Sequence, residues 1–165
     1  MRVNTTAELG KFKTLIQTAL YKSDDIRDLI LGDTSGMKPS DVRKEFKKHV
    51  DSHLFVDEIL TETSTYIFYD VRIPYLHTQT KKCEIIMYMI CHRAIIDDYH
   101  KEGYYGDRVD ILTQMVEKAI INDKDIANSF GIGSLTLDSV DFYNSRRFYG
   151  RLLTFSVPDF RMKRS

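Results

Sequence analysis

The stretch from Gly131 to Phe160 reads GIGSLTLDSVDFYNSRRFYGRLLTFSVPDF, and this stretch decides the fold. It contains two apolar runs joined by the short polar segment 144–146. Aromatic and β-branched residues around such a connection predict a β-hairpin. The first run holds two pairs of apolar residues, each spaced by two, that would lie on opposite faces of a regular strand: Leu135 with Leu137, and Val140 with Phe142.

The second run of the hairpin alternates strictly, with Arg151, Leu153, Phe155 and Val157 on one face. We therefore predict that Leu153 and Phe155 are core residues. Pro158 cannot donate a hydrogen bond to a neighbouring strand, so the strand should end there or lie at an edge. This hairpin is expected to form half of one sheet.

The N-terminal part of the chain shows helical periodicity. Apolar residues at helical spacing predict a first helix over 5–20 and a third over 42–50. Between them, Ser23 is placed to cap a short second helix that ends at Gly32. The third helix carries Arg and Lys on its other face. Residues 54–64 are ambiguous between helix and loop.

The middle of the chain predicts a second hairpin followed by a helix. Residues 66–73 have strand composition, and Pro74 limits that strand. The longest apolar run, 83–96, is apolar on both faces of a strand, which is typical of a central strand. A helix is the alternative for this run, because Met and Ala favour helices. Asp107 then caps a helix over 108–121.

The order helices, hairpin, helix, hairpin predicts an α+β fold. N-terminal helices occupy residues 1–60, and a hairpin–helix–hairpin core over 66–160 forms a sheet of about four strands packed on a helix. The 165 residues favour a single domain, 1–165, which can bury roughly 70% of its unfolded surface without a metal or a disulfide.

Composition restricts the possible partners. Lys+Arg and Asp+Glu are both 24, and this balance argues against a general nucleic-acid binder. Cys83 and Cys91 would lie about 26 Å apart on one strand, too far to bond to each other. Free thiols suit a reducing cytosol. With no signal-like segment and no long apolar run, we expect a cytoplasmic protein with no membrane association.

Candidate catalytic groups are sparse. His49 and His53 have the i, i+4 spacing of a zinc-binding helix, but Val50 stands where a metalloprotease has Glu. Cys91 and His92 are neighbours on a strand, so they would point to opposite faces. We predict no catalytic residue, no cofactor and no metal. A small metal-dependent enzyme using His49, His53 and Asp57 is kept as an alternative.

Tyrosine-rich and basic loops are the candidate contact regions. Tyr combines an apolar body with a polar tip and is enriched at interfaces. The candidate subunit-interface residues come from the loop 97–106 and the polar turn 78–82: Thr78, Lys81, Tyr99, Tyr104 and Tyr105. Arg146 and Arg147, at the tip of the last hairpin, are candidate contacts to DNA phosphates or to a partner protein.

Two segments carry a family resemblance. GDRVDILTQMVEKAI followed by GIGSLTLDSVDF, a short turn and RFYGRLLTFSVPDFR resemble tail terminator proteins of long-tailed bacteriophages, also called neck or tail-completion proteins. The likeness covers residues 66–160 and rests on the order hairpin, helix, hairpin and on the closing strand.

The resemblance implies a structural role in the virion. Such proteins form a hexameric ring on the head-proximal end of the tail tube, stop its polymerisation and join the tail to the head. It implies as partners other copies of the chain, the tail tube protein, a head-completion or connector protein and passing DNA. The implied location is the tail neck of the virion, after assembly in the host cytoplasm. A head-completion or connector protein is the alternative within the same context.

Overall fold

The computed structural model describes residues 5–53, 60, 62–76, 81–129 and 135–160. In these residues, five α-helices and five strands form an α+β arrangement, as predicted, with three helices ahead of the first strand. The helices are α1 (Thr5–Lys22), α2 (Asp24–Leu31), α3 (Pro39–His49), α4 (Arg108–Ile121) and α5 (Lys124–Ser129). The strands are β1 (Val50–Asp51), β2 (Thr65–Leu76), β3 (Lys81–His92), β4 (Thr136–Asn144) and β5 (Phe148–Phe160), and a 3₁₀ turn, η2, covers Arg93–Ile95.

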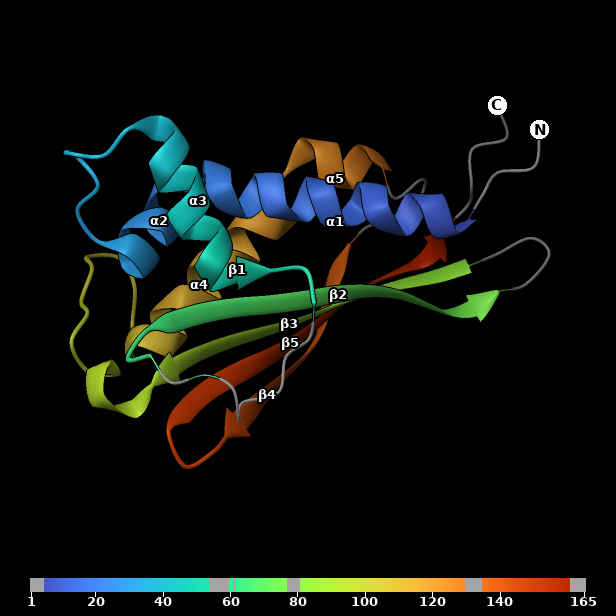
Figure 1. Cartoon of the computed structure of the whole chain (residues 1–165). Helices are drawn as coiled ribbons and strands as arrows, with labels where there is room; N and C mark the ends of the chain where they lie inside the picture. Colours follow the sequence, from blue (N-terminus) through green and yellow to red (C-terminus); the bar gives the residue numbers. More distant parts are fainter. Residues whose placement is uncertain (1–4, 54–59, 61, 77–80, 130–134, 161–165) are drawn as a thin grey trace.

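The five strands form one mixed sheet in the order β1-β2-β3-β5-β4. Only the β1–β2 pair is parallel, and the other neighbours are antiparallel. The predicted last hairpin is present as β4 and β5, and the two hairpins meet where β3 pairs with β5. Figure 1 shows all five helices on one side of this sheet, with α1 running along the length of β2.

The main core lies between the helix layer and the sheet. Alternate residues of β3 and β5 point into it, and the predicted core residues Leu153 and Phe155 are both fully buried there. Cys83 and Cys91 are buried free thiols. Burial raises the pKa of Cys83 to about 12, so this thiol stays protonated at neutral pH. The two cysteines are packing residues in this fold.

The opposite face of the sheet carries a second, smaller aromatic cluster. Its buried members are Tyr66, Phe68, Ile90 and Phe148. The rings of Tyr66 and Phe68 stack with centroids 5.6 Å apart. Because β3 is covered on both faces over part of its length, the prediction of a central strand is confirmed, and the helical alternative for this run is wrong.

Helix termini follow the local signals in the sequence. The Ser23 hydroxyl accepts a hydrogen bond from the Ile26 amide, and Gly32 ends α2 with a φ of 70°, a conformation that favours glycine. Asp107 caps α4, and Asp110 completes a reciprocal capping box. The predicted span of α4, Arg108 to Ile121, agrees with the structure.

Four features differ from the sequence prediction. The sheet has a fifth strand, β1, because two residues after α3 pair with β2. The short helix α5 was not predicted. The strand β3 ends at His92, where the side chain caps η2, and does not continue to residue 96. Strands β2 and β5 run through Pro74 and Pro158, and a register irregularity beside each proline accommodates the missing donor.

Candidate subunit interface

Strand β4 forms one outer edge of the sheet. This nine-residue strand pairs with β5 on one side, and the described strands provide no partner on the other side. An edge strand of this length presents a row of backbone N–H and C=O groups that can pair with another chain. This edge is therefore the starting point for the candidate interface.

A bulge in β4 changes which side chains share a face. The register with β5 shifts between Leu137 and Ser139, so Val140 pairs with Leu153 and Phe142 pairs with Arg151. Leu153 and Arg151 belong to the face under the helices. Leu137, Val140 and Phe142 consequently lie on that same face, and the prediction that the two apolar pairs occupy opposite faces is wrong.

The two apolar side chains beyond the bulge are exposed. Val140 is 52% exposed and Phe142 is 67% exposed, because the helix layer does not extend over them. The nearest helix, α4, reaches as far as β5, where the Asp110 carboxylate accepts hydrogen bonds from the Arg151 guanidinium at 2.9 and 3.1 Å. The parity change from Leu137 to Val140 is a sequence signal for the bulge.

Tyr105, in the loop before α4, is 80% exposed. Two hydrogen bonds join the Gln114 side chain of α4 to the backbone of Tyr105. The Tyr105 amide donates to Gln114 Oε1 at 3.2 Å, and Gln114 Nε2 donates to the Tyr105 carbonyl at 2.6 Å. Gln114 stands one helical turn after Asp110 on α4. The Asp110 carboxylate accepts a hydrogen bond from Arg151, which is the cross-strand neighbour of Phe142.

Tyr99 and Tyr104, the other two tyrosines of the loop 97–106, point inward. The Tyr104 hydroxyl donates a hydrogen bond of 2.7 Å to Asp25 of α2, and Lys101 forms an ion pair of 2.6 Å with the same carboxylate. These contacts, with the Lys101 hydrogen bond first, lower the pKa of Asp25. Tyr99 packs against the core under the Arg108 guanidinium, and burial raises its pKa. Tyr104, a candidate interface residue, is therefore half-buried and bound to α2.

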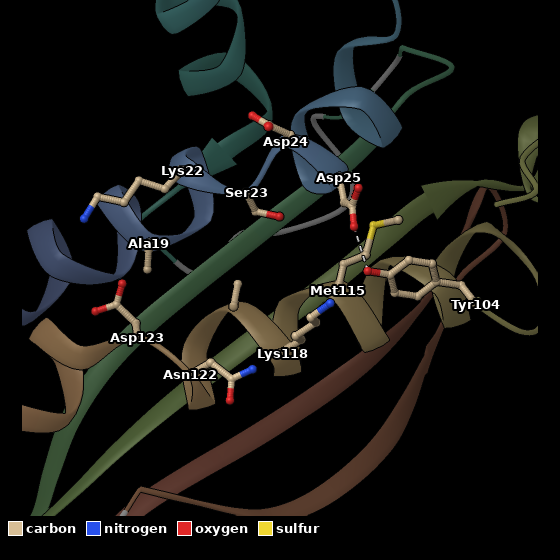
Figure 2. A pocket seen from close by; sticks show the side chains of 11 residues that line it. Ala19, Lys22, Ser23, Asp24, Asp25, Tyr104, Met115, Lys118, Asn122 and Asp123 are labelled. Carbon is tan, nitrogen blue, oxygen red and sulfur yellow. Dashed lines mark hydrogen bonds between the residues drawn. The ribbon is translucent and has the colours of Figure 1, made fainter. Parts of the chain in front are cut away.

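Figure 2 shows the pocket beside the Tyr104–Asp25 contact. It encloses about 450 Å³ between α1, α2 and α4. Its polar lining mixes the carboxylates of Asp24 and Asp123 with the ammonium groups of Lys22 and Lys118. No group of three His, Cys, Asp or Glu side chains suited to a metal ion occurs among the described residues.

The remaining sequence candidates are scattered. Thr78 and Asp57 lie outside the described residues. Lys81 begins β3, where its backbone pairs with Leu76 and Phe160. Arg146 and Arg147 are exposed in the β4–β5 turn, and the Arg93 amide of η2 donates to the Arg147 carbonyl at 2.8 Å, which holds the turn beside the start of the loop 97–106. The roles proposed for them as interface or DNA contacts stay predictions.

The two histidines that could mark a metal site are separated by the fold. The helix α3 ends at His49, so His53 does not share a helix face with it, contrary to the sequence expectation. His49 Nδ1 lies 3.1 Å from the Thr65 carbonyl and 3.0 Å from the Ser64 hydroxyl. His53 Nδ1 lies 2.8 Å from Asp51. His49 thus ties α3 to β2.

Comparisons with known proteins include solved structures and family models. One solved structure, from Akkermansia muciniphila, is described as a structure without the transmembrane region and is 12% identical to this chain in sequence. The alignment covers 100% of this chain and 90% of that chain, with a TM-score of 0.35. No curated protein matches the chain. In the described part of the chain, no helix has the length and apolarity needed to cross a membrane. The model of the YomW family matches residues 14–157, well over half of the sequence, and the chain therefore belongs to the YomW family.

Proposed function

We propose that this protein is a structural virion protein that terminates the tail of a long-tailed bacteriophage. Copies of the chain form a hexameric ring on the head-proximal end of the tail tube, stop its polymerisation and present a surface to the head-completion protein. The observation that carries the proposal is the open edge strand β4 with its exposed side chains Val140 and Phe142.

The family match is the second support. Membership in the YomW family supports a phage-associated protein. A chain that acts by assembly requires contact surfaces, and exposed aromatic residues beside an unpaired strand edge provide one. The proposal assigns no catalytic residue and no cofactor.

The β4–β5 turn is the proposed contact to DNA or to the neighbouring neck protein. Arg146 and Arg147 are exposed at its tip, and Arg93 braces the turn by donating to the Ser145 carbonyl at 3.1 Å. Guanidinium groups on a braced turn suit phosphate contacts without sequence readout. Passing DNA would meet these groups if the turn faces the lumen of the ring.

The test is a deletion of the gene in its phage, complemented with variants, and electron microscopy of the particles. Overlong tail tubes, or tails that never join heads, are the expected phenotype. Tails of normal length that stay separate from unstable heads would instead support the head-completion alternative. Normal particles after complete deletion would reject both structural roles.

A single substitution sharpens this test. Tyr105→Ala should leave the melting temperature near that of the wild type, because the side chain is exposed, and should lower the yield of correctly terminated tails. His100→Ala, at another exposed position of the same loop, is the matched control. Equal yields for both variants would remove Tyr105 from the interface.

A further inference from the structure

The second edge of the sheet is also open. Strand β1 pairs with β2 only at Ile67 and Phe68. Beyond Phe68, the described strands leave the β1 side of β2 without a partner as far as Leu76. This open segment is about as long as β4, so each end of the sheet offers an unpaired edge of similar length.

A groove accompanies this second edge on the helix side of the sheet. It encloses about 470 Å³ between α1, α3 and the β1–β2 pair. The buried ring of Tyr69 contributes to its lining, and its hydroxyl donates to the Lys13 carbonyl at 2.9 Å. Lys13, Arg43 and Lys47 bring three cationic side chains to the groove, and Asp51 brings a carboxylate. Lys13 forms an ion pair of 2.9 Å with Asp70.

The two edges carry opposite charge. The exposed surface of α3, beside the groove, carries a net positive charge: Arg43, Lys44, Lys47 and Lys48 outnumber Asp41 and Glu45, and Glu45 pairs with Lys48. The exposed charges of β4 are the carboxylates Asp138 and Asp141. Glu117 adds an exposed carboxylate on the α4 face that also carries Asp110, the partner of Arg151. The net charges of the two edges therefore favour contact between unlike edges of two copies and disfavour contact between like edges.

Strand direction and side-chain facing also agree. Because β2, β3, β5 and β4 are successively antiparallel, β4 runs opposite to β2. A second copy placed edge to edge in the same orientation therefore brings β4 antiparallel to the open part of β2. Val140 and Phe142 lie on the helix face, which is the side where the groove opens.

We propose that the outer edge of β4 in one copy pairs antiparallel with the open edge of β2 in a second copy of this chain. Phe142 and Val140 enter the groove between α1 and α3 on the helix side of the joined sheet. Such a contact joins two different patches, so its repetition gives a ring or a filament. The inference rests on the proposed function and deepens it by naming the subunit contact.

A mixing experiment on the purified full chain tests the contact. Phe142→Lys blocks the β4 edge, and Lys47→Glu blocks the groove; both positions are exposed, so both variants should keep the wild-type circular dichroism and melting temperature. In sedimentation velocity up to the solubility limit, each variant alone should associate about tenfold more weakly than the wild type. A 1:1 mixture should form heterodimers, because one intact β4 edge then meets one intact groove.

The other outcomes of the mixing experiment overturn the proposal. Wild-type association by the Lys47→Glu variant would show that the groove takes no part, as in a symmetric β4–β4 dimer. A mixture that stays monomeric, or a wild-type chain that stays monomeric throughout, also overturns it. Lys118→Glu, an exposed charge reversal on α4 at neither edge, is the control and should associate like the wild type.

Disulfide trapping separates this contact from the tail role. Phe142→Cys combined with Thr14→Cys, which lines the groove, should give a ladder of cross-linked oligomers on oxidation, and neither single variant should give one beyond a dimer. The native Cys83 and Cys91 are buried and should not contribute. If the double variant gives a ladder but gene deletion leaves tails normal, the tail role is rejected and the subunit contact is kept. If gene deletion gives overlong tails but the double variant gives no ladder, the subunit contact is rejected and the tail role is kept.

Discussion

Gly150 of β5 lies against β3 at a point with no room for a side chain. A Cβ atom at this position would lie 2.6 Å from Ile90 Cγ2 and even closer to the Met89 carbonyl oxygen. On the neighbouring strand, Tyr143 is the cross-strand partner of Gly150, and its ring meets that of Tyr88 on β3 with centroids 5.9 Å apart. The missing side chain lets an aromatic residue of β4 reach across β5 to β3.

Gly150→Ala should therefore lower the free energy of unfolding by about 1–3 kcal/mol, the usual range for overpacking. The backbone carbonyl of Met89 cannot move aside without disturbing the β3–β5 pairing. Gly10→Ala is the control, since nothing lies within 4 Å of a Cβ there and the helical site of α1 favours alanine. Urea denaturation of both variants measures the difference; equal stability would place Gly150 in a looser site.

Asp25 of α2 fixes the tyrosine-rich loop 97–106 to that helix. Its carboxylate accepts from Lys101 and Tyr104, and these bonds lower its pKa. A lowered pKa in the folded state means that Asp25 stabilises the fold above its unfolded pKa of about 3.9. That contribution is lost as the pH falls through the lower folded pKa.

Asp25→Asn should consequently reduce stability at pH 7, with a deficit that shrinks as the pH falls below about 4. Tyr104→Phe, which removes one donor, should reduce the pH dependence in part. Asp41→Asn, in the first turn of α3, controls for the favourable effect of a carboxylate at a helix N-terminus. Melting temperatures measured across the pH range give the result, and a deficit independent of pH would contradict this role.

At the scale of elements, the bulge in β4 separates the core from the interface. The helix face of the β4–β5 hairpin is buried at Leu153 and Phe155 and exposed at Val140 and Phe142. One extra residue in β4 is enough to bring both apolar pairs of that strand to one face. The hairpin therefore stabilises the fold with one strand and offers contact area with the other.

Truncation to alanine should destabilise the fold strongly at one phenylalanine of this hairpin and hardly at all at another. Phe155→Ala should cost about 3–5 kcal/mol, because the ring is fully buried in the main core. Phe142→Ala should change the free energy of unfolding by less than about 0.5 kcal/mol, since its ring is largely exposed. Chemical denaturation at low protein concentration measures both, and a large loss for Phe142→Ala would place its ring in the core.

At the scale of the whole molecule, a formal net charge of zero conceals an uneven distribution. Cations gather on α3 at one end of the sheet, and carboxylates gather beside β4 at the other. A balanced total therefore coexists with two edges of opposite sign. Such complementary patches guide association and disfavour contacts between like edges.

Self-association should accordingly weaken as salt rises, because a Debye length of about 10 Å at 0.1 M screens exposed charges. The Lys47→Glu variant should show a shallower dependence on salt than the wild type. Phe142→Ala should keep the wild-type dependence at a lower affinity, since it removes apolar area and no charge. Sedimentation in a salt series distinguishes these cases, and association that strengthens with salt would mean that apolar burial alone drives it.

The sequence by itself determined the elements whose signals are local. The span and cap of α4, the stop of α2 at Gly32 and the alternation of β5 all follow from residues within a few positions of one another. The two-faced apolar pattern of β3 predicted a central strand for the same reason. Hydrophobic periodicity and capping act over one or two turns, so they can be read from the chain directly.

Only the tertiary structure decided which of these residues form the surface. Tyr104 and Tyr105 are neighbours of one type, but a carboxylate on α2 turns one inward and leaves the other exposed. The pairing of β1 with β2 and the groove beside it join segments distant in sequence. Val140 and Phe142 look like core residues by composition, and they are exposed because the helix layer ends over β5. Exposure depends on where neighbouring elements end, and local periodicity carries no information about that limit.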